Sequence, residues 1–403
     1  MGRKLIYAAI AAAALTTATF SCSKSSDTAS VTASSYLYLS TGLCYAGVGF
    51  TPPLVTDVGV TLSRLNLSTS NYEIVKDYGD LADEVTDTFA SGIIDGNDGY
   101  IYASVENATA TGNRRVDKIQ KAAFGTRTTW YQNSSILNTP VKGIARAADS
   151  GILLGGTTKV ERFDSTPTRK LATTVLAWGE SHLGLCATNN TNITALVALP
   201  AYTGTSYGKY IYAHATPTQN DIGIIDMNGS SAVGSCLANA AGASPLTNAT
   251  SAISSFSATL GANATPTAIV YIATPTGTTT GKLLVSYSAY GVNSAGTLNN
   301  ALVLYDINET GAAAAAISNG QILYNDHNYF FGVTAMAYDS STGLLYVSTS
   351  NDISKLTPVG YNIEKFSINL TTPSATRVTN TDMSSFQSAN SLNNCVTGMV
   401  IGN

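Results

Sequence analysis

The stretch SLNNCVTGMVIGN, residues 391–403, ends the chain with an apolar pattern that predicts a β-strand from Val396 to Ile401. A strand at the end of a chain needs a partner, because its backbone donors and acceptors must be paired once it is buried. The segment VTGMVIG at 396–402 matches VTAMAYD at 333–339 well. The partner of the final strand therefore depends on the larger repeat to which VTAMAYD belongs.

A unit of four short strands recurs along the chain, each strand ending in a turn rich in Asn, Asp, Ser, Pro or Gly. First strands are SGIID (91–95), KGIARAAD (142–149), ITALVALP (193–200), TAIVYIA (267–273) and VTAMAYD (333–339). Second strands are YLYLST (36–41), GYIYAS (99–104), GILLGG (151–156), KYIYAH (209–214), KLLVSY (282–287) and GLLYVS (343–348). Third and fourth strands share the windows 60–75, 115–130, 159–175, 221–236, 301–317 and 353–368.

Five of these units are complete, and the unit nearest the N-terminus lacks its first strand. The C-terminal strand supplies the missing member, so the six units close into a ring. Closure removes the open edges that a linear array of sheets would expose. We therefore predict an all-β fold over residues 35–403, a six-bladed β-propeller closed by the C-terminal strand joining the N-terminal blade.

The blade pattern from Tyr36 to Asn403 resembles the YVTN/NHL-like group of bacterial propellers. The resemblance is carried by the shape of the blades and by no signature motif. It implies that ligands lie at one mouth of the central channel, on the loops between strands. Propellers host enzymes, adhesins, assembly factors and sensors, so the resemblance names no single function.

The first residues resemble the export signal of bacterial lipoproteins. Arg3 and Lys4 precede an apolar run, Leu5–Leu15, that is too short to span a bilayer. The following TATFSCSKSSD resembles a lipobox with Cys22 as the lipidated residue, although Thr19 stands where that family prefers Leu. The alternative is ordinary cleavage after Ala18. We predict a signal peptide at 1–21, a flexible tether at 22–34 and the propeller at 35–403.

This reading predicts a protein of the bacterial cell envelope whose acylated N-terminus binds the lipid membrane. Ser23 after the cysteine, in place of Asp, favours the outer membrane in many Gram-negative bacteria. Only 11% of residues are charged, the net charge is −4 and no basic run is present, so nucleic acid is not an expected partner. We expect the chain to be a monomer.

Four cysteines follow Cys22, and an even number in an exported chain predicts two disulfides. Aligning LYLST at 37–41 with LYVST at 345–349, with Tyr338 and Leu345 as partners, places Cys395 opposite residue 43. We predict a Cys44–Cys395 bond across the ring closure, worth roughly 4–5 kcal/mol in the loop-entropy model. By elimination Cys186 pairs with Cys236. The alternative is four free thiols.

Motifs for catalysis are scarce. The chain has no G-x-S-x-G elbow, phosphate loop or C-x-x-C pair, and its three histidines form no metal-binding doublet. Asp95, Asn97 and Glu106 have part of a calcium-loop spacing, but Tyr100 stands where that loop needs glycine, and a hairpin turn is the favoured interpretation. No resident cofactor is expected, and calcium is the only ion that a spacing suggests.

Polar residues near the first strands are the candidates for a channel-mouth site: Asp95, Asp149, Asp339 and Asn394. Turn chemistry explains these residues equally well.

We expect the protein to act as a binding scaffold for a protein or glycan ligand. The contact candidates are the loops 42–58, 178–192, 240–266 and 324–331, with Trp178, Tyr329 and Phe330 as aromatic anchors or core residues. The alternatives are a metal-dependent hydrolase or lactonase with its site in the channel, and an outer-membrane assembly or structural factor.

Overall fold

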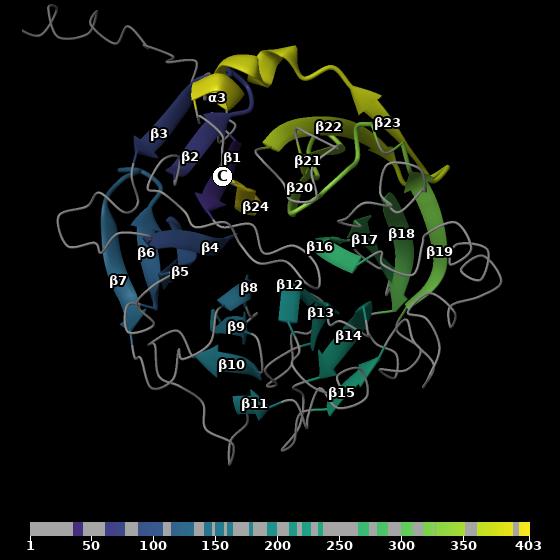
Figure 1. Cartoon of the computed structure of the whole chain (residues 1–403), viewed down its shortest axis with the longest axis horizontal. Helices are drawn as coiled ribbons and strands as arrows, with labels where there is room; N and C mark the ends of the chain where they lie inside the picture. Colours follow the sequence, from purple (N-terminus) through teal and green to yellow (C-terminus); the bar gives the residue numbers. More distant parts are fainter. Residues whose placement is uncertain are drawn as a thin grey trace, which may run out of the picture. The chain divides into compact units, whose positions relative to one another are not determined.

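Six four-stranded antiparallel sheets stand around a common axis in the computed structural model (Figure 1). They belong to one compact unit, residues 35–403. The structure describes residues 35–42, 61–76, 88–107, 114–132, 141–146, 150–156, 159–163, 177–179, 192–199, 209–215, 220–226, 233–236, 265–273, 280–288, 300–308, 317–326, 328–350, 361–389 and 395–403. The six-bladed β-propeller predicted from the repeats is confirmed.

Each sheet is one blade, and its strands follow one another from the channel outward. Blade 1 holds β24 (Cys395–Gly402), β1 (Tyr36–Gly42), β2 (Thr61–Asn66) and β3 (Tyr72–Lys76); blade 2 holds β4 (Thr88–Asp95), β5 (Tyr100–Asn107), β6 (Arg115–Gln120) and β7 (Arg127–Gln132). Blade 3 holds β8 (Val141–Arg146), β9 (Ile152–Gly156), β10 (Lys159–Phe163) and β11 (Ala177–Gly179); blade 4 holds β12 (Asn192–Leu199), β13 (Lys209–Ala215), β14 (Asn220–Asp226) and β15 (Val233–Cys236). Blade 5 holds β16 (Thr265–Ile272), β17 (Thr280–Ser288), β18 (Ala301–Asn308) and β19 (Ile317–Tyr324); blade 6 holds β20 (Ala335–Asp339), β21 (Leu344–Ser350), β22 (Tyr361–Asn369) and β23 (Ser374–Val378).

The C-terminal strand closes the ring as predicted. β24 is the innermost strand of blade 1 and pairs with β1, with Ile401 opposite Leu37. The corresponding pair in blade 6 is Tyr338 opposite Leu345, which is the partnership assumed from the sequence. The Ser35 hydroxyl donates a hydrogen bond to Asn403 Oδ1 at 2.9 Å, so the two ends of the propeller meet at one edge of blade 1.

One detail of the closure differs from the prediction. The ladder shifts register between Ser40 and Thr41, so Cys395 lies opposite Gly42 and not opposite residue 43. The cause is a β-bulge at Thr397, which places one extra residue on β24 and cannot be read from an alternating pattern. Cys44 and Cys186 lie outside the described residues, and both disulfides stay predictions.

The outer strands of blade 6 correct a second prediction. The window 353–368 was expected to hold a third and a fourth strand, but Tyr361–Asn369 is itself the third strand, β22, and pairs with β21. The fourth is β23, which follows the turn at Thr371–Thr372. The alternating segment at 353–356 lies outside the described residues.

A helical segment absent from the all-β expectation follows blade 6. It consists of the 3-10 helix η3 (Thr381–Met383) and the helix α3 (Ser384–Ala389). Asn380 Nδ2 donates to the Ile363 carbonyl at 2.6 Å, and the Ile363 N–H donates to Gln387 Oε1 at 3.0 Å. These two side-chain amides pair with backbone groups of β22 that β23 does not reach.

Among the described residues, no helix has the length and apolar character to cross a membrane.

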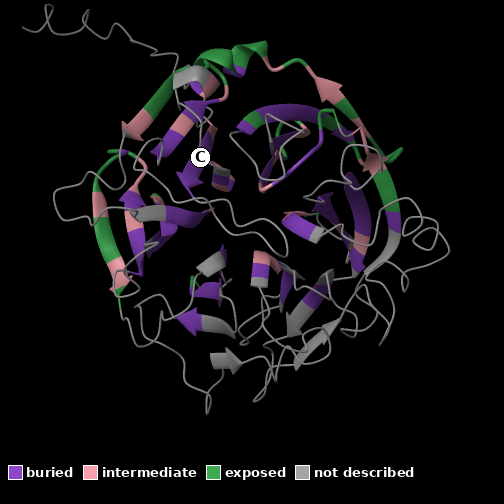
Figure 2. Cartoon of the chain, viewed as in Figure 1, coloured by how far each residue is buried: buried purple, intermediate pink, exposed green. Residues whose placement is uncertain are grey.

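The core lies between the blades, because alternate residues of each inner strand face different neighbours. In β17, Leu283 and Val285 pack in a cluster with Ile211 of blade 4, whereas Leu284 packs in a cluster with Val347 of blade 6. All five side chains are fully buried. Figure 2 shows the same pattern in blades 1, 2, 5 and 6, with buried residues concentrated on the inner strands and exposed ones on the outer strands.

Candidate functional site

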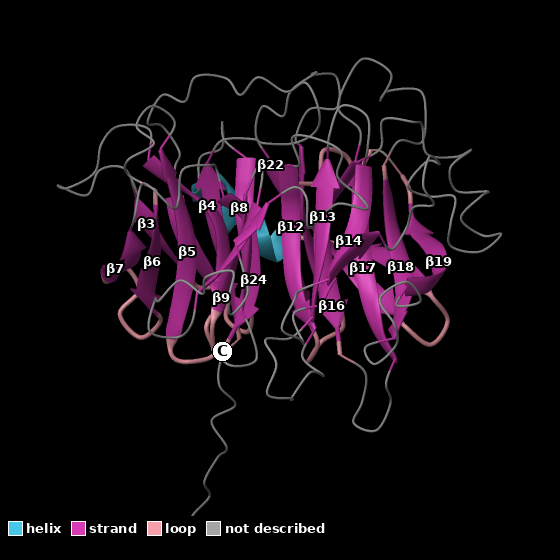
Figure 3. Cartoon of the chain, turned by 90° about the horizontal axis from the view of Figure 1, so that it is seen from below, coloured by secondary structure: helices cyan, strands magenta, loops and turns pink. Residues whose placement is uncertain are grey.

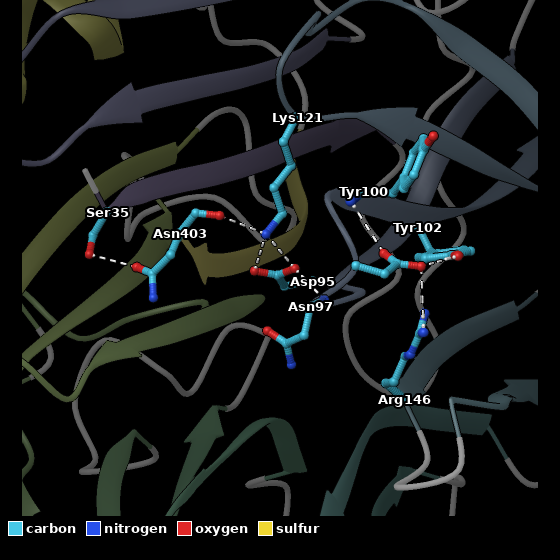
Figure 4. Close-up of polar contacts among 9 residues, drawn as sticks. Ser35, Asp95, Asn97, Tyr100, Tyr102, Lys121, Arg146 and Asn403 are labelled. Atoms are coloured by element: carbon cyan, nitrogen blue, oxygen red, sulfur yellow. Dashed lines mark hydrogen bonds and ion pairs between the residues drawn. The ribbon is translucent and has the colours of Figure 1, made fainter. Parts of the chain in front are cut away.

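A carboxylate predicted for the channel mouth, Asp95, lies at the end of the innermost strand β4. Its oxygens lie 2.7 Å from the Lys121 ammonium, which also donates to the Asn403 carbonyl at 2.9 Å (Figure 4). The Asn97 N–H donates to Asp95 Oδ1 at 2.8 Å. The Asp95 and Lys121 side chains are 10% and 11% exposed, so the pair is largely withdrawn from water. Lys121 thus connects blade 2 to the end of the closing strand.

A second carboxylate, Asp98, extends this polar cluster to blade 3. It accepts hydrogen bonds from the Tyr102 hydroxyl at 2.8 Å and from the Tyr100 N–H at 3.3 Å (Figure 4). The Arg146 guanidinium, at the end of β8, lies 3.5 Å from Asp98 and 5.0 Å from the Tyr102 ring centroid. A line of compensated charges therefore joins three neighbouring blades at one edge of the ring.

Each carboxylate of this cluster faces a cation: Asp95 faces Lys121, and Asp98 faces Arg146. These ion pairs are suited to stabilise the turn between β4 and β5. Strands β4 and β5 form the predicted hairpin, with Asn97 and Gly99 in the left-handed region at φ 52° and 85°. Glu106 lies near the far end of β5 and pairs with Arg114 at 2.6 Å. Within the described part of the chain, no group of three or more His, Cys, Asp and Glu residues is placed to hold a metal ion.

The carboxylate of Asp339 is bound by residues of the turn that follows it. Its carboxylate accepts hydrogen bonds from the Ser341 N–H at 2.9 Å, the Ser341 hydroxyl at 2.6 Å and the Thr342 hydroxyl at 2.7 Å. Burial alone would raise the pKa of this carboxyl, but the hydrogen bonds from Ser341 and Thr342 outweigh burial and lower it below its ordinary value of 3.8. The other two candidates, Asp149 and Asn394, lie outside the described residues.

The lowered pKa of Asp339 predicts an acid-dependent contribution to stability. The unfolded chain takes up this proton at a higher pH than the native state does, so the contribution is present above the ordinary pKa and is lost as pH falls through the lowered one. We expect Asp339→Asn to flatten the rise of unfolding free energy with pH between about 2 and 5, measured by urea denaturation. Ser341→Ala, which removes one donor, is expected to have a smaller effect; an unchanged slope in Asp339→Asn would contradict this account.

Hydroxyl groups recur near the start of the innermost strand in every blade except blade 3, a feature unrecognised in the sequence. The innermost strands of blades 1 to 5 each carry a β-bulge near their start, where one residue is skipped by the ladder to the second strand. The skipped residues are Thr397, Ser91, Lys142, Thr194 and Thr267. Thr334, just before β20, has the corresponding place in blade 6.

These hydroxyls join strands within a blade and blades to one another. Inner and second strands are linked by the pairs Thr397–Ser40 (3.0 Å), Ser91–Ser104 (3.0 Å), Thr267–Ser286 (2.9 Å) and Thr334–Ser348 (3.2 Å). Between blades, the Thr397 hydroxyl donates to the Ala90 carbonyl, and the Thr194 hydroxyl donates to the Pro266 carbonyl at 2.7 Å. The signal in the sequence is Thr or Ser followed by Gly or Ala early in the first strand, which recurs in five of the six units.

The aromatic candidates have different environments. Phe330 is fully buried between Tyr324 and Phe366, whereas its neighbour Tyr329 is 39% exposed. The Tyr329 ring lies over the Arg377 guanidinium, whose Cζ is 3.8 Å from the ring centroid. Trp178 is in β11, and its side chain lies outside the described residues.

Comparison with known proteins gives similarity of low identity. No protein-family model matches the chain, and no curated protein matches it either. The extracellular domain of a one-component system from Bacteroides thetaiotaomicron is 11% identical, with a TM-score of 0.45, covering 90% of this chain and 36% of that one. A protein from Lactobacillus plantarum is 8% identical, with a TM-score of 0.46, covering 92% of this chain and 100% of that one. The major Malassezia sympodialis allergen Mala s 1 is 11% identical, with a TM-score of 0.45, covering 72% of this chain and 81% of that one. This chain thus spans about a third of the length of the Bacteroides protein.

Proposed function

We propose that the protein is a lipid-anchored component of the bacterial cell envelope, in the outer membrane, whose propeller serves as a binding scaffold. The observation that carries the proposal is the place where the propeller begins. Ser35 is hydrogen-bonded to Asn403, which lies beside Asp95 and Lys121. We call this the anchor edge: β1 begins there, and the innermost strands β24 and β4 end there (Figure 3).

The tether then determines which edge is free for a ligand. The residues from Cys22 to Ser34 span at most about 45 Å when extended and about 20 Å on average as a flexible chain. A propeller held at this distance presents the anchor edge to the membrane. The distal edge, where β1 and the outer strands such as β23 end, is directed away from it and is the surface available to a partner.

Lipid anchoring is tested by replacing Cys22 with alanine in the full chain expressed in a Gram-negative host. We expect the wild-type protein in the membrane fraction, extractable by detergent, with an N-terminal peptide that begins at Cys22 and carries acyl chains. We expect Cys22→Ala to lose the acyl modification and most of its membrane association, because one lipidated residue supplies the anchor. Ser25→Ala, in the same tether, is the control and should behave as wild type. Equal membrane recovery of Cys22→Ala would refute the anchor.

The same cells test the scaffold. A photo-reactive phenylalanine analogue replaces Tyr329 near the distal edge or Tyr72 on blade 1, two tyrosines that are 39% and 44% exposed. Irradiation of intact cells is expected to give an adduct from position 329, discrete with a protein partner and polydisperse with a glycan. Little is expected from position 72, because Tyr72 begins β3 opposite Leu65, near the anchor edge. Adducts from neither position would argue against a scaffold that uses this part of the distal edge.

A further inference from the structure

A rigid, exposed aromatic side chain lies between the outer strands of blades 5 and 6. Tyr329 follows a turn in which the Asp326 carbonyl accepts hydrogen bonds from the N–H groups of Tyr329 (3.2 Å) and Phe330 (3.0 Å). Phe330 is buried among aromatic rings and holds the turn to the core. A tyrosine fixed in this way loses little conformational freedom when a ligand covers it, which lowers the cost of binding.

Arg377, the last residue but one of β23, supports this ring and offers hydrogen-bond donors. Its Nε donates to Glu364 Oε2 at 2.8 Å, and the Glu364 side chain is only 8% exposed. The pKa of Arg377 is raised, first by this hydrogen bond. Among the residues that the structure describes, neither Nη group of Arg377 has a hydrogen-bond partner, although the side chain is 33% exposed. The two Nη groups, with two N–H donors each, thus lie beside the Tyr329 ring without a partner among the described residues.

Asp326 supplies acceptors in the same place. Its Oδ1 accepts hydrogen bonds from the Asn328 N–H at 3.0 Å and the Asn328 amide at 2.9 Å, while Oδ2 has no partner within the described residues. The neighbouring Tyr324 is close enough to all three residues for its pKa to respond to them. Burial raises the pKa of Tyr324, Asp326 and Tyr329 raise it further, and Arg377 lowers it. Within the described residues, the Tyr329 ring therefore has unpaired Nη groups of Arg377 beside it and a carboxylate oxygen without a partner in its own turn.

We propose that Tyr329, Arg377 and Asp326 form a carbohydrate-binding platform for a neutral oligosaccharide or polysaccharide, which rests on the proposed scaffold function and names its ligand class. A sugar ring presents C–H groups on its face and hydroxyls, each both donor and acceptor, around its rim. Arg377 stacks on the Tyr329 ring, and the side chain is still 39% exposed, which leaves aromatic surface to stack on the sugar. Arg377 and Asp326 then match the rim hydroxyls.

The local charge favours a neutral sugar over an acidic one. Arg377 is already paired with Glu364, and Asp326 adds a second carboxylate, so the platform carries one cation and two anions. A ligand with its own carboxylate or sulfate would be repelled by Asp326. A neutral glycan has no such penalty, and its hydroxyls can use both kinds of group.

The test is affinity electrophoresis of residues 35–403, which contain all six blades and form one compact unit. Native gels contain a soluble neutral polysaccharide, in turn a mannan, a xylan, a β-glucan, a starch or a galactan. We expect retardation by at least one of them. Tyr329→Ala should weaken that affinity by about tenfold or more, as for a central aromatic contact. Tyr329→Phe keeps the ring and should stay within about threefold of wild type, since only the hydroxyl is lost.

Three further arms decide the assignment. Tyr72→Ala removes an equally exposed tyrosine elsewhere and should leave the affinity unchanged. Arg377→Lys keeps the charge without the planar pair of donors and should weaken binding severalfold. Polygalacturonate should retard the protein less than the neutral polymers do. No retardation in any gel, or equal loss in Tyr72→Ala and Tyr329→Ala, overturns the platform. A protein adduct from position 329 in cells would then keep the scaffold and replace the ligand class.

Discussion

Asp117→Ala is expected to destabilise the propeller by about 3–5 kcal/mol, measured by urea denaturation. Asp117 is fully buried in blade 2 and accepts hydrogen bonds from Arg115 Nε at 2.8 Å and Arg127 Nη1 at 3.2 Å. The two arginine side chains are 9% and 11% exposed. Removing the carboxylate takes an ion-pair partner from two arginines that are largely withdrawn from water, which costs far more than at an exposed site.

A surface ion pair of the same chemistry is the control. Arg64 and Glu73 face each other across β2 and β3, with Nε and Nη2 at 3.0 and 2.7 Å from Glu73 Oε2, but the Glu73 side chain is 46% exposed. Glu73→Ala should cost about 1 kcal/mol or less, because water replaces the lost partner. Comparable losses from Asp117→Ala and Glu73→Ala would show that burial of the blade 2 group has been misjudged.

Gly398→Val is expected to cost about 3 kcal/mol or more, because it pushes the closing strand away from its neighbour. A Cβ atom at Gly398 would lie 2.7 Å from the Ile93 backbone nitrogen and 3.0 Å from the Ser40 hydroxyl oxygen. The backbone contact cannot be relieved by a rotamer change, so β24 or β4 must shift. Thermal unfolding and protease sensitivity of the C-terminal strand measure the effect.

A variant on the same strand controls for added volume alone. Val400 is only partly buried, so Val400→Ile should change stability by less than about 1 kcal/mol. If Gly398→Val were as stable as the wild-type protein, β24 would not pack against β4 as described. Gly398→Ala should fall between the two, with the cost set by how far the strands separate.

The ring and its closure could be predicted because they depend on local alternation and on repetition. VTGMVIG and VTAMAYD have the same pattern, and their registers against β1 and β21 correspond. The third and fourth strands of blade 6 could not be predicted correctly, because the segment at 353–356 also alternates and is itself predicted as the third strand. The helix α3 has six residues, too few for a periodic signal, and Phe386 packing on Tyr72 stabilises it.

The candidate sites depend on contacts between residues far apart in the sequence. Asp95 was predicted at the end of a first strand, but its partner Lys121 follows the third strand and Arg146 comes from another blade. Tyr329 and Phe330 are neighbours of the same type with opposite exposures, because one turn directs only the second into the core. Thr397 and Ser91 stand at bulges, which shift the ladder without changing the apolar pattern.

The hydroxyl contacts of the innermost strands imply that different junctions of the propeller respond differently to salt and acid. The rim contains ion pairs such as Arg64–Glu73, which are weakened by salt and lost in acid. Between blades 4 and 5, the Thr194 hydroxyl donates to the Pro266 carbonyl, and this contact has no charge to be screened or titrated. Between blades 2 and 3, Arg146 instead faces the Asp98 carboxylate. Acid would therefore weaken the junction of blades 2 and 3 before the junction of blades 4 and 5.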